Sequence, residues 1–217
     1  MSRLRLFPLR TVLFPGMELP LQVFEDRYRT LVAECIQNGE PFGVSLIREG
    51  PEVGGPAVPH QVGCTARIVR VSPTRDGRLA LQCVGVRRFR IVQLYDDRAY
   101  LSADVEYPVD ETGEVDPEAL EAVRARLRRL YRLRDTIANE YHRDVDVPES
   151  PGLLADRIGA LGRGLLTDRQ LQQLLATLDV RRRFELADDV LTAAVSSTHE
   201  QAAAVVAQRW AALERRN

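Results

Sequence analysis

The 217-residue chain contains no lysine, so all 30 of its basic residues are arginine. Phosphate-loop ATPases and peptidases that use a Ser–Lys pair both need a lysine in the active site. The 217 residues can therefore form neither a phosphate-loop ATPase site nor a Ser–Lys peptidase site. The 30 basic and 31 acidic residues leave a net charge of -1. This balance predicts no general attraction to nucleic acid or to an anionic membrane.

Cysteine and long apolar runs are also scarce. The three cysteines, Cys35, Cys64 and Cys83, show no paired spacing, which is typical of a protein from a reducing compartment. No apolar run approaches the length of a membrane span, and the first residues lack the apolar centre of a signal peptide. We therefore expect a soluble, cytoplasmic protein without a membrane partner.

One group of residues offers soft metal ligands: His60, Cys64 and, across a possible hairpin, Cys83. Structural zinc sites normally show paired Cys or His spacings, and this group does not. Cysteines in strands more often behave as small buried hydrophobes. We expect no metal and no cofactor.

The most specific pattern lies in the first 28 residues, where prolines interrupt two short apolar segments. Pro8, Pro15 and Pro20 cannot donate to a sheet ladder, so each is expected at a strand end, an edge or a bulge. Pro15 and Gly16 are typical of a type II turn, in which glycine takes a positive φ. The sequence predicts a strand, a tight turn and a second strand.

A helix is expected directly after this run. Asp26 places an acidic residue in its first turn, which favours a helix N-terminus. Apolar residues then recur at helical spacing. They are Tyr28, Leu31, Val32, Cys35 and Ile36.

Together these motifs resemble the N-terminal, substrate-binding domain of the Lon protease family, whose members open with a similar proline-interrupted run. Later segments resemble its successive strands, and the likeness covers nearly the whole chain. The matching segments are 6–28, 42–47, 63–68, 76–78 and 86–91. The chain resembles a stand-alone domain of this kind, without the ATPase and peptidase domains.

Residues 1–110 are expected to form a β-rich lobe. Segment 42–48 is almost continuously apolar, as in a strand covered on both faces. Segment 50–59 is rich in Gly and Pro and predicts a surface loop. Further strands are expected at 63–72, 78–84, 86–94 and 100–107, with an Asp76-Gly77 turn between the first two. With the resemblance, this predicts an α+β protein whose N-terminal part is a PUA-like, partly closed β-barrel with one early helix.

Residues 117–217 are expected to form a C-terminal helical bundle after a polar linker. A long helix is predicted from Pro117 to Tyr141, and another after Pro151. Thr167 begins a capping box, and Asp179 can cap a fourth helix. Segment 197–200 can cap a fifth helix or lie within a continuous one.

Arg134 and the arginine run 181–183 in this part each lead to a specific prediction. Arg134 falls within an apolar helix stripe, so it either extends to solvent at the lobe boundary or pairs with Asp156 or Asp189. The run 181–183 is expected to form a solvated face, with contact to a partner or to carboxylates of the β-rich lobe as the alternatives.

Two motifs are superficially catalytic. Ser45 lacks the second glycine of a nucleophile elbow, so an interior strand serine is the ordinary interpretation. Segment 159–164 is rich in glycine, but it follows a helix rather than a strand, which predicts an inter-helix turn and not a phosphate loop.

The resemblance implies a non-catalytic module that binds exposed apolar segments of unfolded or partly folded proteins. Delivery to a separate protease or chaperone is a further partner interaction that it suggests. The alternative is a PUA-like RNA-binding module. Residues 1–110 hold 14 Arg and 13 acidic residues, which argues against nucleic acid as a partner.

The candidate peptide-binding residues lie mainly around the proline-interrupted strand, where an open edge also invites strand addition. Segment 50–59 would form a flexible rim beside them. Arginines from segment 87–90 are further candidates, although a solvated basic strand is the ordinary interpretation of that run. The candidates are Phe14, Met17, Leu19, Pro20, Phe24, Arg88 and Arg90.

Overall fold

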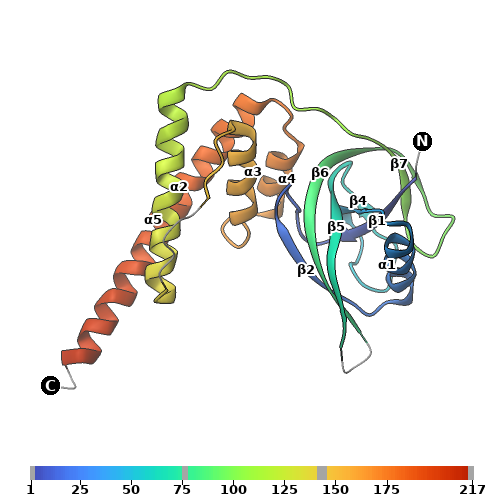
Figure 1. The fold of residues 1–217 in the computed structure, drawn as a ribbon, viewed down its shortest axis with the longest axis horizontal. Coiled ribbons are helices and arrows are strands. Elements are labelled where there is room, and N and C mark those ends of the chain that lie inside the picture. The colour runs from blue at the N-terminus through green and yellow to red at the C-terminus, as the bar shows by residue number, and fades with distance from the viewer. Residues whose placement is uncertain (1–2, 75–77, 141–145, 215–217) are drawn as a thin grey trace. The chain divides into compact units, whose positions relative to one another are not determined.

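The computed structural model describes residues 3–74, 78–140 and 146–214. The chain divides into two compact units, one of Met1–Asp110 with Thr167–Leu178 and one of Glu111–Leu166 with Asp179–Asn217 (Figure 1). The strands are β1 (Leu4–Leu9), β2 (Glu18–Val23), β3 (Phe42–Glu49), β4 (Val58–Pro59), β5 (Val62–Pro73), β6 (Leu79–Tyr95) and β7 (Ser102–Glu106). The helices are α1 (Asp26–Asn38), α2 (Pro117–Ala138), α3 (Pro151–Leu161), α4 (Asp168–Ala176) and α5 (Val180–Glu214).

The sheet of the first unit runs in the order β1-β7-β6-β5-β3-β4, with β2 added to β6. Its neighbours are antiparallel except for β1 and β3, which pair in parallel with Leu6 opposite Gly43. This last pairing joins two separate parts of the path, so the sheet is partly ring-like without being a barrel. The α+β class and the early helix are confirmed.

β6 is one continuous strand of 17 residues, whereas the sequence predicted two strands at 78–84 and 86–94. The glycine between them explains the difference. A Cβ on Gly85 would lie 2.1 Å from the carbonyl oxygen of Phe14, so only glycine lets the two backbones approach this closely. The strand continues past Gly85 and exchanges β2 for β7 as its neighbour. The predicted turn at Asp76-Gly77 lies outside the described residues.

The turn before β2 has the predicted form. Met17 N donates to Phe14 O at 3.1 Å, and Gly16 has φ 75°. Gly85 N in turn donates to Met17 O at 2.9 Å. The turn is therefore tied to the middle of β6 and fixes where β2 begins.

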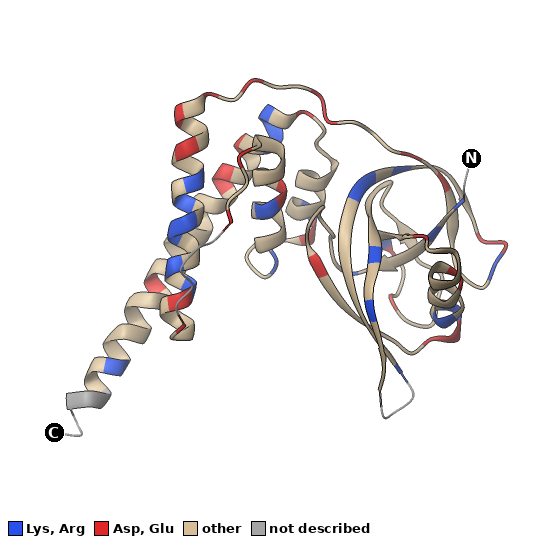
Figure 2. Ribbon diagram, viewed as in Figure 1, with Lys and Arg blue, Asp and Glu red and all other residues tan. Residues whose placement is uncertain are grey.

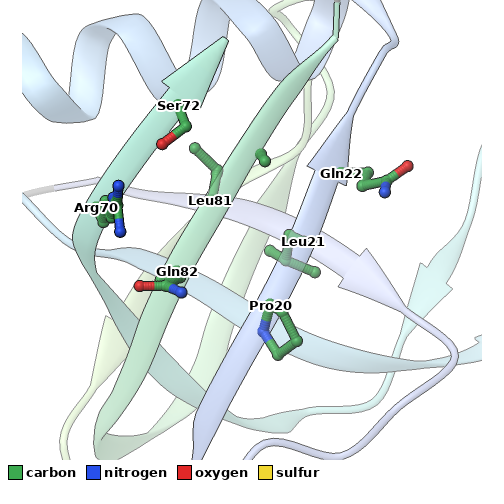
Figure 3. A pocket seen from close by; sticks show the side chains of 8 residues that line it. Pro20, Leu21, Gln22, Arg70, Ser72, Leu81 and Gln82 are labelled. Carbon is green, nitrogen blue, oxygen red and sulfur yellow. The ribbon is translucent and has the colours of Figure 1, made fainter. Parts of the chain in front are cut away.

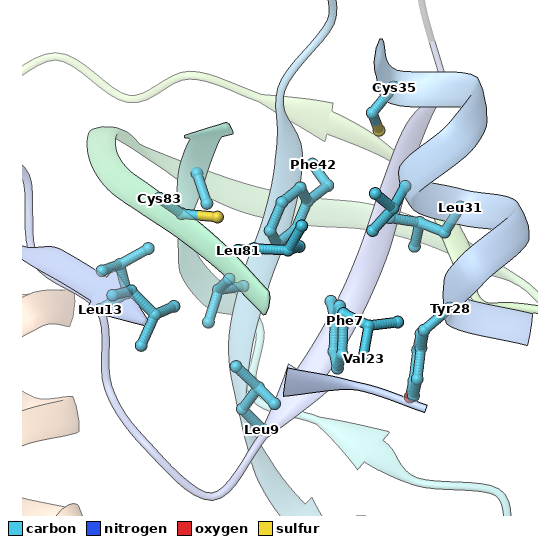
Figure 4. Packing of buried hydrophobic residues seen from close by; sticks show 14 of the residues in the cluster. Phe7, Leu9, Leu13, Val23, Tyr28, Leu31, Cys35, Phe42, Leu81 and Cys83 are labelled. Atoms are coloured by element: carbon cyan, nitrogen blue, oxygen red, sulfur yellow. The ribbon is translucent and has the colours of Figure 1, made fainter. Parts of the chain in front are cut away.

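The main core of this unit lies between the sheet and α1 (Figure 4). Tyr28, Leu31, Val32 and Cys35 are buried as the helical spacing predicted, and Leu31 is fully buried. Ile36 was expected on the same apolar face but is 52% exposed. It lies in the last turn of α1, next to the helix end at Gly39.

α4 belongs with the sheet. Arg88 Nε donates to Leu175 O at 2.8 Å, and Gln172 Nε2 donates to Val62 O at 2.9 Å. The predicted capping box at Thr167 is present, with Gln170 as its partner. The predicted division into lobes 1–110 and 117–217 remains a proposal. α4 falls within the second predicted lobe by sequence but groups with residues 1–110 in the structure.

The second unit contains α2, α3 and α5. α2 starts at Pro117 as predicted and ends at Ala138, while Tyr141 lies outside the described residues. Asp179 accepts from Arg182 N at 2.8 Å and caps α5. α5 continues to Glu214 without a break at 197–200. Within it the Ser196 hydroxyl donates to Thr192 O at 3.1 Å.

A buried ion pair lies inside this unit. Arg183 is 0% exposed, and its Nε is 3.6 Å from Oδ1 of the buried Asp156. The prediction of a solvated face is therefore wrong for Arg183, although Arg181 and Arg182 are exposed. The sequence alone does not show which side of α5 meets α3. It therefore could not indicate which of the three arginines is buried.

Arg134 takes a partner that the sequence did not indicate. Its Nη2 donates to Leu161 O at 3.3 Å, at the C-terminal end of α3, where free carbonyls attract a cation. Among the described residues the ion-pair partner of Asp156 is Arg183, so the expected Arg134–Asp156 pair is not found. None of the helices in the described ranges is both long and apolar enough to cross a membrane.

Candidate functional site

A small apolar hollow lies beside the edge strand β2. It has a volume of about 300 Å³ and is bounded by β2, the start of α1 and the loop between β3 and β4. We call it the β2 hollow. It is lined by Phe7, Leu9, Pro20, Leu21, Gln22, Val23, Phe24, Glu25, Tyr28, Glu52 and Val53.

Two apolar side chains on the rim of the β2 hollow face solvent. Phe24 is 45% exposed and Val53 is 54% exposed, and both line the same hollow. Pro20 on β2 is exposed as well. Large apolar side chains grouped around a concavity, rather than scattered singly, are typical of an interaction site.

The floor of the hollow contains a stacked pair of aromatic rings. Phe7 of β1 and Tyr28 of α1 stack with ring centroids 3.8 Å apart and planes 8° apart (Figure 4). A tyrosine is neutral at physiological pH, and burial raises the pKa of the Tyr28 hydroxyl further above its ordinary value. The Arg27 guanidinium lies 4.5 Å from the centre of the same ring. A neutral aromatic floor suits an apolar ligand.

The loop that forms the outer wall is anchored from the start of α1. Arg27 donates to Gly55 O at 3.1 Å and forms an ion pair with Glu25 at 2.9 Å. Glu25 in turn accepts from Gly54 N at 3.2 Å. These contacts tie the glycine-rich segment, which the sequence predicted as a flexible rim, to the start of α1.

A second concavity lies on the other face of the same strand (Figure 3). It has a volume of about 460 Å³ and crosses three neighbouring strands, β2, β6 and β5. We call it the outer groove. Its lining combines apolar residues with the polar side chains of Gln22, Arg70, Ser72 and Gln82, and the full set is Pro20, Leu21, Gln22, Arg70, Ser72, Ala80, Leu81 and Gln82. The two concavities share Pro20, Leu21 and Gln22, so β2 separates them.

The predicted apolar site residues separate into surface and core. Pro20 and Phe24 line the β2 hollow. Phe14 is 0% exposed and Leu19 is 2% exposed, so both belong to the interior. Met17 is half-buried against the core. Alternation along β2 explains the difference between Leu19, which faces inward, and its neighbour Pro20, which faces outward.

The basic run at 87–90 does not form an open cationic surface. Arg88 is buried and holds the end of α4. Arg90 pairs with Glu106 at 3.2 Å, and Arg87 lies over the Tyr107 ring at 3.5 Å. The expectation that Arg88 faces outward is corrected, because β6 presents this residue to α4. Figure 2 shows acidic as well as basic residues along the sheet unit.

Sequence reasoning missed the floor and one wall of the β2 hollow. Leu9 and Tyr28 read as ordinary core residues, and both are buried. Val53 carried a usable signal, since it is the one large apolar residue between Gly50 and Gly55. A single valine in a predicted surface loop is a candidate for an exposed apolar contact, and Val53 is 54% exposed.

The other candidates for chemistry have structural roles. Ser45 is buried and donates to His60 O at 2.7 Å. Cys64 and Cys83 are buried, and they sit in different places of the ladder, opposite Arg88 and Ile68 respectively. Within the described ranges, no group of three or more His, Cys, Asp or Glu residues could hold a metal ion.

Comparison with known families decides what kind of domain carries this site. The model of the ATP-dependent protease La (LON) substrate-binding domain matches residues 3–193. The chain belongs to this family. The Lon substrate-binding match includes β2, the loop before β4 and all the residues that line both concavities.

Relatives in this family are Lon proteases much longer than the chain. The Lon protease of Paraburkholderia phytofirmans is 34% identical over 187 residues, which cover 83% of this chain and 23% of the relative. Lon protease 2 of Myxococcus xanthus is 30% identical over 194 residues, covering 87% and 23%. The chain thus spans about a quarter of the length of these relatives.

Solved structures give the same family. A Lon N-terminal domain protein from Xanthomonas campestris has a TM-score of 0.63 and 30% identity, covering 85% of this chain and 96% of that one. The N-terminal domain of the Mycobacterium avium complex Lon protease has a TM-score of 0.66. At 22% identity, with 88% and 98% of the chains covered, this second likeness concerns the fold alone.

Proposed function

We propose that this chain is a non-catalytic recognition module that binds exposed apolar segments of unfolded or partly folded proteins. The observation that carries the proposal is the β2 hollow, an apolar concavity whose rim exposes Phe24 and Val53. A folded protein buries its apolar segments, so an apolar site of this kind binds chains that have lost their structure. Membership of the Lon substrate-binding family supports this ligand class. Bound segments would then pass to a protease or chaperone.

The test uses one protein in two states. Fluorescently labelled, reduced and carboxymethylated α-lactalbumin serves as the unfolded ligand, and the same protein with calcium and intact disulfides serves as the folded control. Anisotropy titrations should show saturable binding of the unfolded form and none of the folded form. Equal binding of both forms, or of neither, would contradict the proposal.

A companion measurement addresses the RNA-binding alternative. Labelled single-stranded RNA replaces the unfolded protein in the same titration, at 50 and 200 mM salt. We expect no saturable binding, because the basic residues at 87–90 are buried, stacked or paired within the fold. Tight, strongly salt-dependent binding of the RNA would favour the alternative.

A further inference from the structure

The edge of β2 that faces away from β6 has no strand partner among the described residues. The ladder on its other edge runs antiparallel, with Pro20 opposite Gln82 and Leu21 opposite Leu81. In such a ladder the backbone groups of alternate residues point to alternate sides. The hydrogen bond from Gly85 N to Met17 O fixes which residues point to β6. Leu19, Leu21 and Val23 follow in the same phase.

The backbone of Glu18, Pro20 and Gln22 consequently points to the open edge. This assignment agrees with the chemistry of proline, because Pro20 has no N–H to give to β6. The edge offers the carbonyls of all three residues and the N–H groups of Glu18 and Gln22. Such a row of backbone groups is a template for another extended chain.

The side chains on either side of this edge fit an extended ligand as well. A strand places successive side chains on opposite faces of the sheet. Beside β2 one face opens into the β2 hollow. The other face opens into the outer groove, where the polar side chains of Gln22, Gln82 and Ser72 lie (Figure 3). An added strand would therefore direct every second side chain into an apolar concavity and the others towards Gln22, Gln82 and Ser72.

We propose that the site binds its ligand by antiparallel strand addition to β2, and so selects extended segments in which apolar and polar residues alternate. This inference rests on the proposed function and specifies the class of segment. A helical apolar segment repeats its side chains with a period of 3.6 and would leave the edge N–H and carbonyl groups unpaired. Segments that form strands in their own folded proteins have the required period of two.

The geometry predicts which backbone amides of the ligand matter. In an antiparallel pair, residues directly opposite each other point their side chains to the same face. The ligand residues that bond to Glu18, Pro20 and Gln22 therefore point their own side chains into the outer groove, and these are the polar residues of the ligand. The apolar residues in the β2 hollow direct their amides away from β2.

The test uses a synthetic peptide of alternating Leu and Thr with terminal Arg residues for solubility. One version carries N-methyl groups on the Thr amides, and the other carries them on the Leu amides. Strand addition predicts that methylated Thr amides weaken binding at least tenfold, while methylated Leu amides leave it within about twofold. Equal losses for the two versions, or loss from methylated Leu alone, would overturn the inference.

A matched pair of protein variants tests the backbone N–H group that β2 contributes to the hydrogen bonds with the peptide. Gln22→Pro removes an outward N–H and should weaken the unmethylated peptide about fivefold to tenfold, since one hydrogen bond is lost. Gln22→Ala keeps that N–H and loses only the side chain, so it should bind the peptide more tightly than Gln22→Pro. Identical binding by both variants would count against strand addition.

Failure of this inference is distinguishable from failure of the proposed function. If the unmethylated peptide and unfolded α-lactalbumin both bind but the methyl groups have equal effects, recognition uses side chains alone. If neither ligand binds, the proposed function itself is wrong. Thermal unfolding of both Gln22 variants checks that the ladder to β6 is intact, and we expect unchanged midpoints because the Gln22 N–H lies outside that ladder.

Discussion

Phe7 and Tyr28 stack face to face, with ring centroids 3.8 Å apart, and together form the floor of the β2 hollow. The contact joins β1 to α1 at the point where the main core meets the candidate binding site. The hollow therefore has an aromatic floor fixed by the core of the unit, and only its rim is open to a ligand.

Tyr28→Ala should destabilise the protein by about 3 kcal/mol, because it removes a buried ring and leaves Phe7 beside a cavity. The midpoint of urea denaturation, followed by circular dichroism, measures the effect. Phe24→Ala is the control, since that ring is 45% exposed and should cost about 1 kcal/mol or less. Equal costs for the two variants would contradict the placement of Tyr28 in the core and Phe24 on the rim.

Asp156→Ala should cost about 3–5 kcal/mol, because the fully buried Arg183 keeps its charge and loses its carboxylate partner. Glu185→Ala removes the partner of the exposed Arg181 and Arg182 and should cost about 0.5 kcal/mol or less. Urea denaturation again gives both values.

A double variant separates charge from packing at this pair. Replacing Arg183 with Met and Asp156 with Leu should recover most of the loss, because apolar groups of similar volume need no solvation. If the double variant is as unstable as Asp156→Ala, the pair contributes through shape and hydrogen bonding to its neighbours rather than through charge.

Two buried thiols should make the protein less stable in alkali. Burial raises the pKa of Cys35 to about 11 and that of Cys83 to about 12, from an ordinary value of 9.0. Above pH 9 the unfolded chain releases these protons and the native chain retains them. The contribution to stability is therefore complete below pH 9 and is lost as the pH rises towards 11–12.

The expected slope is about 1.4 kcal/mol per pH unit for each thiol between pH 9 and 11. Urea midpoints at pH 8, 9 and 10 measure it. A variant with Ala at both positions is the control for titration of other groups, and its stability should fall less steeply over the same range. Parallel curves for the parent and the variant would contradict the assignment.

Arg88→Met should loosen α4, because it removes the side-chain bond to the carbonyl of Leu175. Amide exchange across α4 should accelerate about tenfold, which is the effect of losing roughly 1.4 kcal/mol of local stability. Arg90→Met is the matched control on the same strand, where the lost ion pair to Glu106 is exposed. Equal amide exchange rates in the two variants would show that contacts other than the Arg88 hydrogen bond hold α4 in place.

Much of this fold could be predicted from local patterns. The Pro15-Gly16 turn, the Thr167 capping box and the start of α2 at Pro117 all depend on neighbours in sequence, and all are present. The continuous β6 was missed, because the role of Gly85 depends on the backbone of Phe14, some 70 residues away. Long-range approach of two backbones leaves no periodic signal.

The site was predicted in part, for the same reason. Proline and aromatic residues at Pro20 and Phe24 pointed to β2, and both line the β2 hollow. The inward position of Phe14 and the burial of Arg88 depend on which face of each strand meets the core or α4. Met17 is half-buried and packs on the core, so a substitution there would not separate an effect on binding from an effect on stability.

The most direct test of the proposed recognition role compares Phe24→Asp with Val92→Asp. Both replace an exposed apolar side chain of the sheet unit, 45% and 65% exposed respectively, but only Phe24 lines the β2 hollow. Titration of each variant with unfolded, carboxymethylated α-lactalbumin gives the affinity, and urea denaturation confirms that both remain folded. We expect Phe24→Asp to weaken binding at least tenfold, because a carboxylate in the hollow opposes apolar burial, and Val92→Asp to bind like the parent. Unchanged binding by a folded Phe24→Asp variant would contradict the assignment of the β2 hollow as the binding site.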